Sequence, residues 1–329
     1  MRIWRATAFG DPQEVLKQVE LELPKLADNE FKIRVLASGV GLPDYFMVKG
    51  GYPLVPKPPA SPGQEVVGVV TEVGSKAAYE VGDRVVTATR FSRGFGGFAQ
   101  EVIVSAKDRL SCIAPAVFSD EQAAGFLIPY HTGYYGLVRR GRMKASDTVL
   151  VLGGPGSSGS AAIQIAKAVG AKVIAVAGTD EKEEFCKRLG ADETINYRKG
   201  SIHGQALKLT DNRGVDIIYD PVGGAPAADA LEAITHNGRL VLIGFAAGAW
   251  AKVSASHIVQ KNYDVIGAFM GHHTPAEIRE AQTALETWAE KGIVAPPIDK
   301  VFQFNQVPDL MKRLEKGEML GKMVLRVSE

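Results

Sequence analysis

From residue 148 onward, short apolar runs alternate with helical segments, and this alternation constrains the fold more than any other feature of the chain. The runs expected to be strands are 148–152, 172–177, 194–197, 215–219, 239–243 and 264–269. The helices expected among them are 158–169, 181–189 and 225–234. Before them, Ser119 is expected to cap a helix start, and a further helix is expected at 132–140. Strands that alternate with helices favour a parallel sheet with right-handed crossovers. We therefore predict a six-stranded, doubly wound α/β sheet.

A glycine-rich loop joins the first of these strands to its helix. Gly153, Gly156 and Gly159 recur at every third position after Leu152. Such glycines permit a tight turn, let the main chain approach a pyrophosphate and allow close packing of helix on sheet. The start of the following helix offers free N–H groups and the positive end of its dipole. The loop therefore predicts a dinucleotide site of the Rossmann type.

The end of the second strand bears on which dinucleotide binds. An NAD enzyme carries Asp or Glu there, which bonds the ribose 2′-hydroxyl. This chain has Val-Ala-Gly-Thr at 176–179, and the acidic pair at 180–181 is typical of the next helix start. Lys182, Tyr197 and Arg198 are nearby candidates to hold a 2′-phosphate, although a solvated helix lysine is an equal reading of Lys182. The missing carboxylate favours NADPH.

The first third of the chain reads as β structure with tight turns. Residues 31–37 alternate with period two, and 66–73 is mostly β-branched, so a small barrel-like domain is expected. The helix and short strands after residue 271 cannot form a core alone and should return to that domain. We predict a β-rich catalytic domain from residues 1–122 and 271–329, a dinucleotide domain from 123–270, and a ligand site in the cleft between them.

Composition argues against several classes of partner. The 329 residues carry a formal net charge of +1, so no strong field draws the chain to nucleic acid or to an anionic membrane. No apolar run approaches the roughly 18 residues that cross a bilayer. The two cysteines, Cys112 and Cys186, form no disulfide framework and suit a reducing compartment. We expect a cytoplasmic protein with a small-molecule partner.

Outside the glycine loop, short motifs are spread over nearly the whole chain. They are ASGVGLPD (37–44), PGQEVVG (62–68), VGDRV (81–85), YHTGYY (130–135), GAD (190–192), DPVGG (220–224) and GKMVL (321–325). Together with the loop, they resemble the quinone oxidoreductase branch of the medium-chain dehydrogenases/reductases, a group that includes zeta-crystallin. The resemblance implies a GroES-like β-rich catalytic domain and a Rossmann domain.

Zinc-dependent alcohol dehydrogenases of that superfamily bind their catalytic zinc through two cysteines and the His of a Gly-His-Glu motif. By resemblance, Gly41, Gln64 and Ile128 stand at those positions here, and none of them is a convincing zinc ligand. The structural zinc loop of four cysteines is also missing. We therefore expect no metal, and reduction of an already electrophilic, conjugated acceptor rather than alcohol chemistry.

The resemblance also implies which side chains serve the site. Asp44 and Tyr52 match family positions in the cleft, and we expect them to act in catalysis, with Tyr52 as the candidate proton donor. A tyrosine that only packs its loop is an alternative reading. The residues expected to contact the cofactor are Thr132, Gly153, Gly156, Ser157, Ser158, Gly159, Gly178, Thr179, Lys182, Tyr197, Gly244 and Phe245.

These features favour an NADPH-dependent oxidoreductase that transfers a hydride to a quinone. Two alternatives stay open: a reductase of α,β-unsaturated carbonyls or enoyl thioesters, and an NADPH-binding protein with a structural or RNA-binding role. The strand at 264–269 should lie at a sheet edge, and an uncovered apolar edge invites pairing. Since relatives join two such edges, we expect a homodimer.

Overall fold

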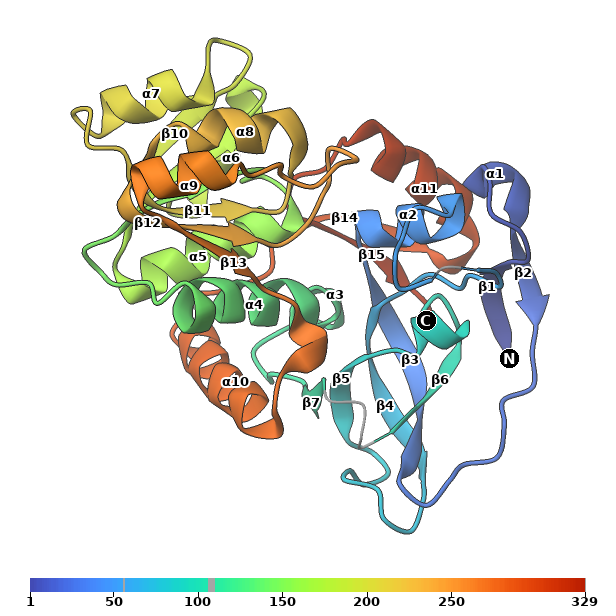
Figure 1. The fold of residues 1–329 in the computed structure, drawn as a ribbon. Helices are drawn as coiled ribbons and strands as arrows, with labels where there is room; N and C mark the ends of the chain where they lie inside the picture. Colours follow the sequence, from blue (N-terminus) through green and yellow to red (C-terminus); the bar gives the residue numbers. More distant parts are fainter. Residues whose placement is uncertain (56, 106–109, 329) are drawn as a thin grey trace. The chain divides into compact units, whose positions relative to one another are not determined.

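The computed structural model describes residues 1–55, 57–105 and 110–328, and the chain divides into two compact units (Figure 1). Unit 1 comprises Met1–Ile128, Thr274–Ile278 and Ala295–Glu329, and unit 2 comprises Pro129–His273 and Arg279–Val294. The sequence placed the domain changes near residues 122 and 271 and kept everything after 271 in the first domain. Among the described residues, no helix combines the length and apolarity needed to span a bilayer.

Unit 2 contains a six-stranded sheet whose paired strands all run parallel. The strands lie in the order β10 (Glu193–Asn196), β9 (Lys172–Ala177), β8 (Thr148–Val151), β11 (Val215–Asp220), β12 (Ile234–Leu242) and β13 (Asp264–Gly267). The order runs outward from β8 in both directions, so the carboxyl ends of β8 and β11 flank the point where the winding reverses. The predicted doubly wound sheet is confirmed.

The two faces of this sheet are covered by different helices, because alternate strand residues point to opposite faces. Leu150, Ile218 and Leu240 share one buried cluster with residues of α7 (Ile202–Leu209) and α8 (Gly224–Leu231). Tyr219 and Val241 point the other way, toward Gly136. The remaining helices of the Rossmann region are α5 (Ser157–Val169), α6 (Asp180–Arg188) and α9 (Ala255–Lys261) (Figure 1).

The helix predicted at 132–140 differs from the observed structure. An α-helix, α4 (Leu127–Gly133), is followed by π-helical turns in η2 (Tyr134–Arg140). Gly136 packs closely on the sheet here, since a Cβ at this residue would lie 3.0 Å from Ile243 Cδ1 and 3.3 Å from Val241 Cγ1. Close approach of this kind accompanies the wider helical turn, a feature that sequence periodicity does not report.

Unit 1 is built on a mainly antiparallel sheet that two strands from the C-terminal part of the chain complete. Its strands lie in the order β14 (Ile298–Gln303), β15 (Lys322–Arg326), β3 (Glu30–Val40), β4 (Glu65–Val73), β5 (Arg84–Ala88) and β7 (Ser111–Ile113). A further strand, β6 (Glu101–Ser105), also pairs with β3. Strands β1 (Arg2–Ala6) and β2 (Leu16–Glu20) form a separate two-stranded sheet. The C-terminal β15 pairs antiparallel with β3. This topology is that of the GroES-like fold predicted from the sequence.

Short helices accompany this sheet. They are α1 (Pro12–Val15), α2 (Leu42–Lys49), α3 (Asp120–Ala124) and α11 (Val307–Lys316), while α10 (Pro275–Glu290) begins in unit 1 and continues in unit 2. Ser119 caps α3 by accepting a hydrogen bond from Gln122 N, as its sequence predicts. Apolar residues of α2 and α11 share a buried cluster with β15, which attaches the C-terminal segment to the N-terminal part of the unit.

Candidate functional site

The glycine loop of unit 2 has the geometry of an anion cradle. Gly153 has φ +59°, a left-handed conformation that favours glycine. A Cβ at Gly159 would lie 2.2 Å from the Gly153 carbonyl oxygen, so the helix start leaves no room for a side chain there. Gly156, the N-cap residue of α5, offers no side-chain hydrogen bond. A helix start of this kind presents main-chain N–H groups to an anion.

The loop after β9, like the glycine loop after β8, lies at the carboxyl ends of the parallel strands. Gly178 follows β9, and a Cβ on it would lie 2.5 Å from the hydroxyl oxygen of Tyr197, whose side chain is half exposed. Thr179 caps α6 by accepting a hydrogen bond from Lys182 N at 3.3 Å. The phenol therefore occupies the space where a side chain at position 178 would begin.

The carboxylate that follows this turn is held by other groups. Asp180 accepts a hydrogen bond from Lys199 Nζ at 2.5 Å, and this contact lowers the pKa of the exposed Asp180 carboxyl. Asn196 Nδ2 also lies 3.4 Å from the same Asp180 oxygen. Asp180 is therefore bound to neighbouring side chains rather than standing free at the end of β9.

The loop after β12 carries the last two predicted cofactor contacts. Gly244 N donates to the Asp220 carbonyl oxygen at 3.2 Å, which holds this loop against the end of β11. The Phe245 ring lies 4.9 Å from the Trp250 ring, centroid to centroid. Because the strands are parallel, the loops after β8, β9 and β12 all lie at the carboxyl ends of the strands, on one side of the sheet. The structure thus brings the predicted residues of the glycine loop, those of the adenosine end, and Gly244 and Phe245 to that side.

Thr132 belongs to a different neighbourhood within unit 2. Its hydroxyl donates to Met270 Sδ at 2.6 Å. The preceding His131 is fully buried, with Nε2 2.8 Å from Gln282 Oε1. Burial lowers the pKa of His131 to about 4, and the nearby His273 adds to the effect, so this imidazole is neutral near pH 7.

In unit 1, Asp44 joins two main-chain segments. Its side chain is 2% exposed, with Oδ2 accepting from Gly41 N at 2.9 Å and Oδ1 accepting from Gly63 N at 2.7 Å. Burial raises the pKa of the Asp44 carboxyl to about 6, against the opposing effect of the two amides and of Lys322. Both oxygens are thus engaged by the protein's own backbone.

Tyr52 lies beside this group. Its hydroxyl is within hydrogen-bonding reach of the Gln64 side chain, burial raises its pKa, and the charge of Asp44 raises it further. Its ring centroid lies 6.2 Å from that of Phe91. The structure therefore brings the two residues predicted to act in catalysis, Asp44 and Tyr52, into one part of unit 1, together with Gln64.

The positions that correspond to zinc ligands in other members of the superfamily have other partners. Gly41 N bonds to Asp44, and Ile128 N donates to Glu65 Oε2 at 2.8 Å. Within residues 1–55, 57–105 and 110–328, no three or more His, Cys, Asp or Glu side chains gather in a way that could hold a metal ion.

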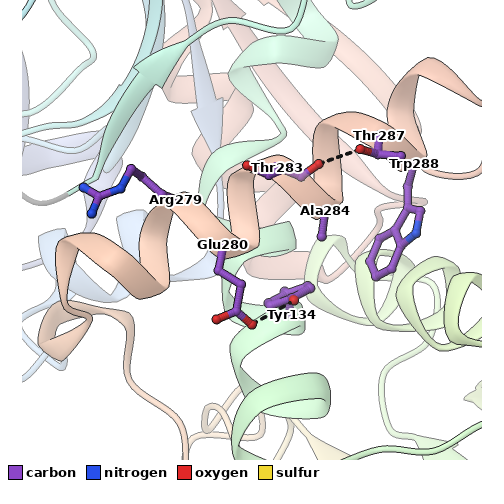
Figure 2. Close-up of a pocket in the computed structure, with 7 residues that line it drawn as sticks. All are labelled: Tyr134, Arg279, Glu280, Thr283, Ala284, Thr287 and Trp288. Atoms are coloured by element: carbon purple, nitrogen blue, oxygen red, sulfur yellow. Dashed lines mark hydrogen bonds between the residues drawn. The ribbon is translucent and has the colours of Figure 1, made fainter.

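A surface cavity of about 450 Å³ in unit 2 was not foreseen from the sequence (Figure 2). Its lining residues are Tyr134, Arg279, Glu280, Thr283, Ala284, Thr287 and Trp288. The Tyr134 hydroxyl donates to Glu280, which also pairs with Arg139 at 2.6 Å. None of the predicted cofactor residues lines this cavity, and Arg279 points away from the Tyr134 and Trp288 rings (Figure 2).

A parallel six-stranded sheet with this glycine loop, together with a GroES-like unit, defines a medium-chain dehydrogenase/reductase. The family model described as alcohol dehydrogenase GroES-like domain matches residues 27–114, and the one described as zinc-binding dehydrogenase matches residues 159–287. Human quinone oxidoreductase is 30% identical over 327 residues, which cover 99% of this chain and 97% of the relative. The chain belongs to the quinone oxidoreductase family of this superfamily.

Solved structures show the same likeness. Escherichia coli quinone oxidoreductase complexed with NADPH has a TM-score of 0.91 and 28% identity, and the match covers 99% of this chain and all (100%) of that chain. A probable oxidoreductase from Mycobacterium abscessus has a TM-score of 0.87 and 33% identity, with 99% of each chain covered. The chain is therefore similar to oxidoreductases of known structure over its whole length.

Proposed function

We propose that this oxidoreductase transfers a hydride from NADPH to a quinone. The observation that carries the proposal is the cradle at the start of α5, where Gly159 lies too close to Gly153 for any side chain. A pyrophosphate fits such a helix start, because its charge meets main-chain N–H groups and the positive end of the helix dipole. Full-length likeness to quinone oxidoreductases supports the acceptor class.

The end of β9 supports NADPH over NADH. An Asp or Glu that bonds a ribose 2′-hydroxyl would have to begin where the Tyr197 phenol already packs on Gly178. Asp180, the next carboxylate, is held by Lys199. Lys182 in the first turn of α6 and the half-exposed Tyr197 are the groups we assign to a 2′-phosphate. A related structure is described as a complex with NADPH.

When bound, NADPH supplies the hydride. The chain's own residues bind and orient the reactants: the α5 cradle holds the pyrophosphate, and Thr132, Gly244 and Phe245 are assigned to the nicotinamide end. Asp44 acts as a positioning residue, since its carboxylate ties Gly41 to Gly63. A quinone needs little acid catalysis, because its ring stabilises the reduced oxygen.

Reduction of an activated double bond is the second candidate, and Tyr52 is the observation that favours it. A phenol with the usual tyrosine pKa of about 10 is protonated near pH 7, and burial of Tyr52 raises its pKa further from that range. An enone requires a proton donor at the α-carbon, and a positioned phenol supplies one. Tyr52 is therefore assigned as the proton donor for enones and is dispensable for quinones.

Steady-state oxidation of NADPH and NADH with a panel of quinones and a panel of enones tests these assignments. We expect turnover with NADPH and quinones in the unaltered enzyme. Tyr52→Phe should lower turnover of enones by about 10²-fold or more and leave quinones nearly unchanged. Tyr79→Phe, which changes another partly buried tyrosine of unit 1, is the matched control. NADPH binding without oxidation by either panel would favour the binding-only alternative over an enzyme.

We also propose that the protein is a homodimer and that it is located in the cytoplasm. β13 lies at the edge of the unit 2 sheet, and its Val265 is 38% exposed. An edge strand of this kind invites pairing with a second copy, so we assign a homodimer through β13. Neither Cys112 nor Cys186 takes part in a disulfide, which suits the cytoplasm.

A further inference from the structure

A buried tyrosine touches the start of the helix that forms the glycine cradle. Tyr219 on β11 is fully buried, and its hydroxyl oxygen lies 2.9 Å from that of Ser158, in the first turn of α5. β11 pairs with β8, with Tyr219 opposite Val151. The ring lies near Gly136, since a Cβ there would be 3.4 Å from Tyr219 Cε2. The sequence had not singled out Tyr219 as a site residue.

The direction of this hydrogen bond follows from burial. Either oxygen could be the donor by distance alone. Ser158 is the hydrogen-bonding partner that the structure gives the Tyr219 hydroxyl, and burial raises the pKa of this phenol, so it stays protonated. If Ser158 donated, the Tyr219 proton would be buried without an acceptor, which costs as much as a lost hydrogen bond. Tyr219 is therefore the donor and Ser158 Oγ the acceptor.

This direction leaves the Ser158 proton for another acceptor. The Gly154 carbonyl, four residues before Ser158, receives the hydroxyl of Ser160 instead, at 3.5 Å. Ser158 is partly exposed, and it lies in the same turn as the cradle glycines. A hydroxyl that accepts one hydrogen bond also becomes a better donor in a second one.

We propose that Tyr219 is a positioning residue for cofactor binding: it holds the Ser158 hydroxyl so that the serine donates to a phosphate oxygen of the dinucleotide. This rests on the proposed function, because it assumes that the pyrophosphate binds at α5. A hydrogen bond from a hydroxyl to a charged phosphate oxygen is stronger than one between neutral groups. Tyr219 touches neither cofactor nor acceptor and acts through Ser158.

Three variants test the proposal by titration with NADPH and by steady-state kinetics. Ser158→Ala should raise the Kd for NADPH about 10-fold, and Tyr219→Phe about 3- to 10-fold, because the phenylalanine ring keeps the packing but loses the hydroxyl. The double variant should bind NADPH no more weakly than Ser158→Ala alone, since both changes disrupt the same hydrogen-bonded arrangement of Tyr219, Ser158 and phosphate. The loss should fall mainly on the KM for NADPH, so that kcat/KM for NADPH falls more than kcat at saturating NADPH in each variant.

Tyr263→Phe is the matched control. Tyr263 is also a buried tyrosine of unit 2, but its hydroxyl bonds to His257 Nδ1 at 3.1 Å, so its loss should leave the Kd for NADPH unchanged. If Tyr219→Phe binds NADPH as tightly as the unaltered protein, or if the effects of Tyr219→Phe and Ser158→Ala add in full, the positioning role is refuted. If the unaltered protein does not bind NADPH, the proposed function itself fails.

Discussion

Lys322 Nζ lies 2.5 Å from Glu65 Oε1, and the two side chains are only 6% and 3% exposed. The ion pair links the C-terminal strand β15 to β4 across the intervening β3. The other oxygen of Glu65 accepts from Ile128 N, at the last residue of the first segment of unit 1. One carboxylate thus holds three distant parts of the chain together.

Removal of the lysine should destabilise unit 1 strongly. Lys322→Met leaves the Glu65 carboxylate buried without its counter-charge, which costs about 3–5 kcal/mol. Adding Glu65→Gln should recover much of this loss, because the amide carries no charge and still accepts from Ile128 N. Chemical unfolding curves of the three proteins measure the effect. Lys76→Met, which removes an exposed pair with Asp28, should shift stability by less than about 1 kcal/mol.

Two glycines of the cradle should respond differently to alanine. A Cβ at Gly159 would meet the Gly153 carbonyl oxygen at 2.2 Å, whereas one at Gly156 would stay at 3.4 Å. Gly159→Ala should therefore lower the melting temperature, while Gly156→Ala should fold normally and bind NADPH about 10-fold more weakly, because the methyl group stands where the pyrophosphate approaches. Unaltered NADPH affinity in a folded Gly156→Ala protein would argue against this location of the pyrophosphate.

His131 should make the protein less stable in mild acid. Its pKa is about 4 in the folded protein and about 6.5 in an unfolded chain. Between these values the unfolded chain binds the extra proton, so the free energy of unfolding falls as pH drops from 6.5 to 4, by up to about 3 kcal/mol. In His131→Gln this contribution should vanish. Asp44, whose pKa is raised to about 6, makes the free energy of unfolding rise as pH drops from 6 to 4. The effect of His131 is therefore measured as the difference between the pH–stability curves of the unaltered protein and His131→Gln.

The edge strand β13 should carry the dimer contact. Val265→Arg introduces a charge on this edge and should convert the predicted dimer to a monomer in light scattering at micromolar concentration. Val259→Arg changes a more exposed valine, 74% accessible on α9, and should leave the assembly unchanged. A monomeric unaltered protein, or a dimer that survives Val265→Arg, would contradict the assignment.

Local patterns in the sequence predicted the parallel sheet and the glycine loop well, because both depend on residues close together in the chain. The Ser119 cap of α3 is of the same kind. Contacts between distant segments were not predictable: Lys322 and Glu65 each stand in a recognised motif, yet their pairing depends on β15, β3 and β4 lying side by side. The Tyr219–Ser158 contact likewise depends on β11 pairing with β8.

The π-helical turns at 134–140 escaped prediction for a related reason. Apolar periodicity marked the segment as helical, but the widened turns accompany close packing of Gly136 on sheet residues more than 80 positions away. Asp44 shows the limit for the site. Resemblance marked it for catalysis, and only the three-dimensional structure shows that both of its oxygens accept hydrogen bonds from the main-chain amides of Gly41 and Gly63.

The most direct test of the account is a titration of the purified protein with NADPH and with NADH under identical conditions, repeated on Lys182→Ala. We expect NADPH to bind at least about 10-fold more tightly than NADH, since a 2′-phosphate gains charge-assisted hydrogen bonds. That preference should shrink in Lys182→Ala, with NADH affinity unchanged. Binding of neither dinucleotide, or equal affinity for the two, would contradict the account.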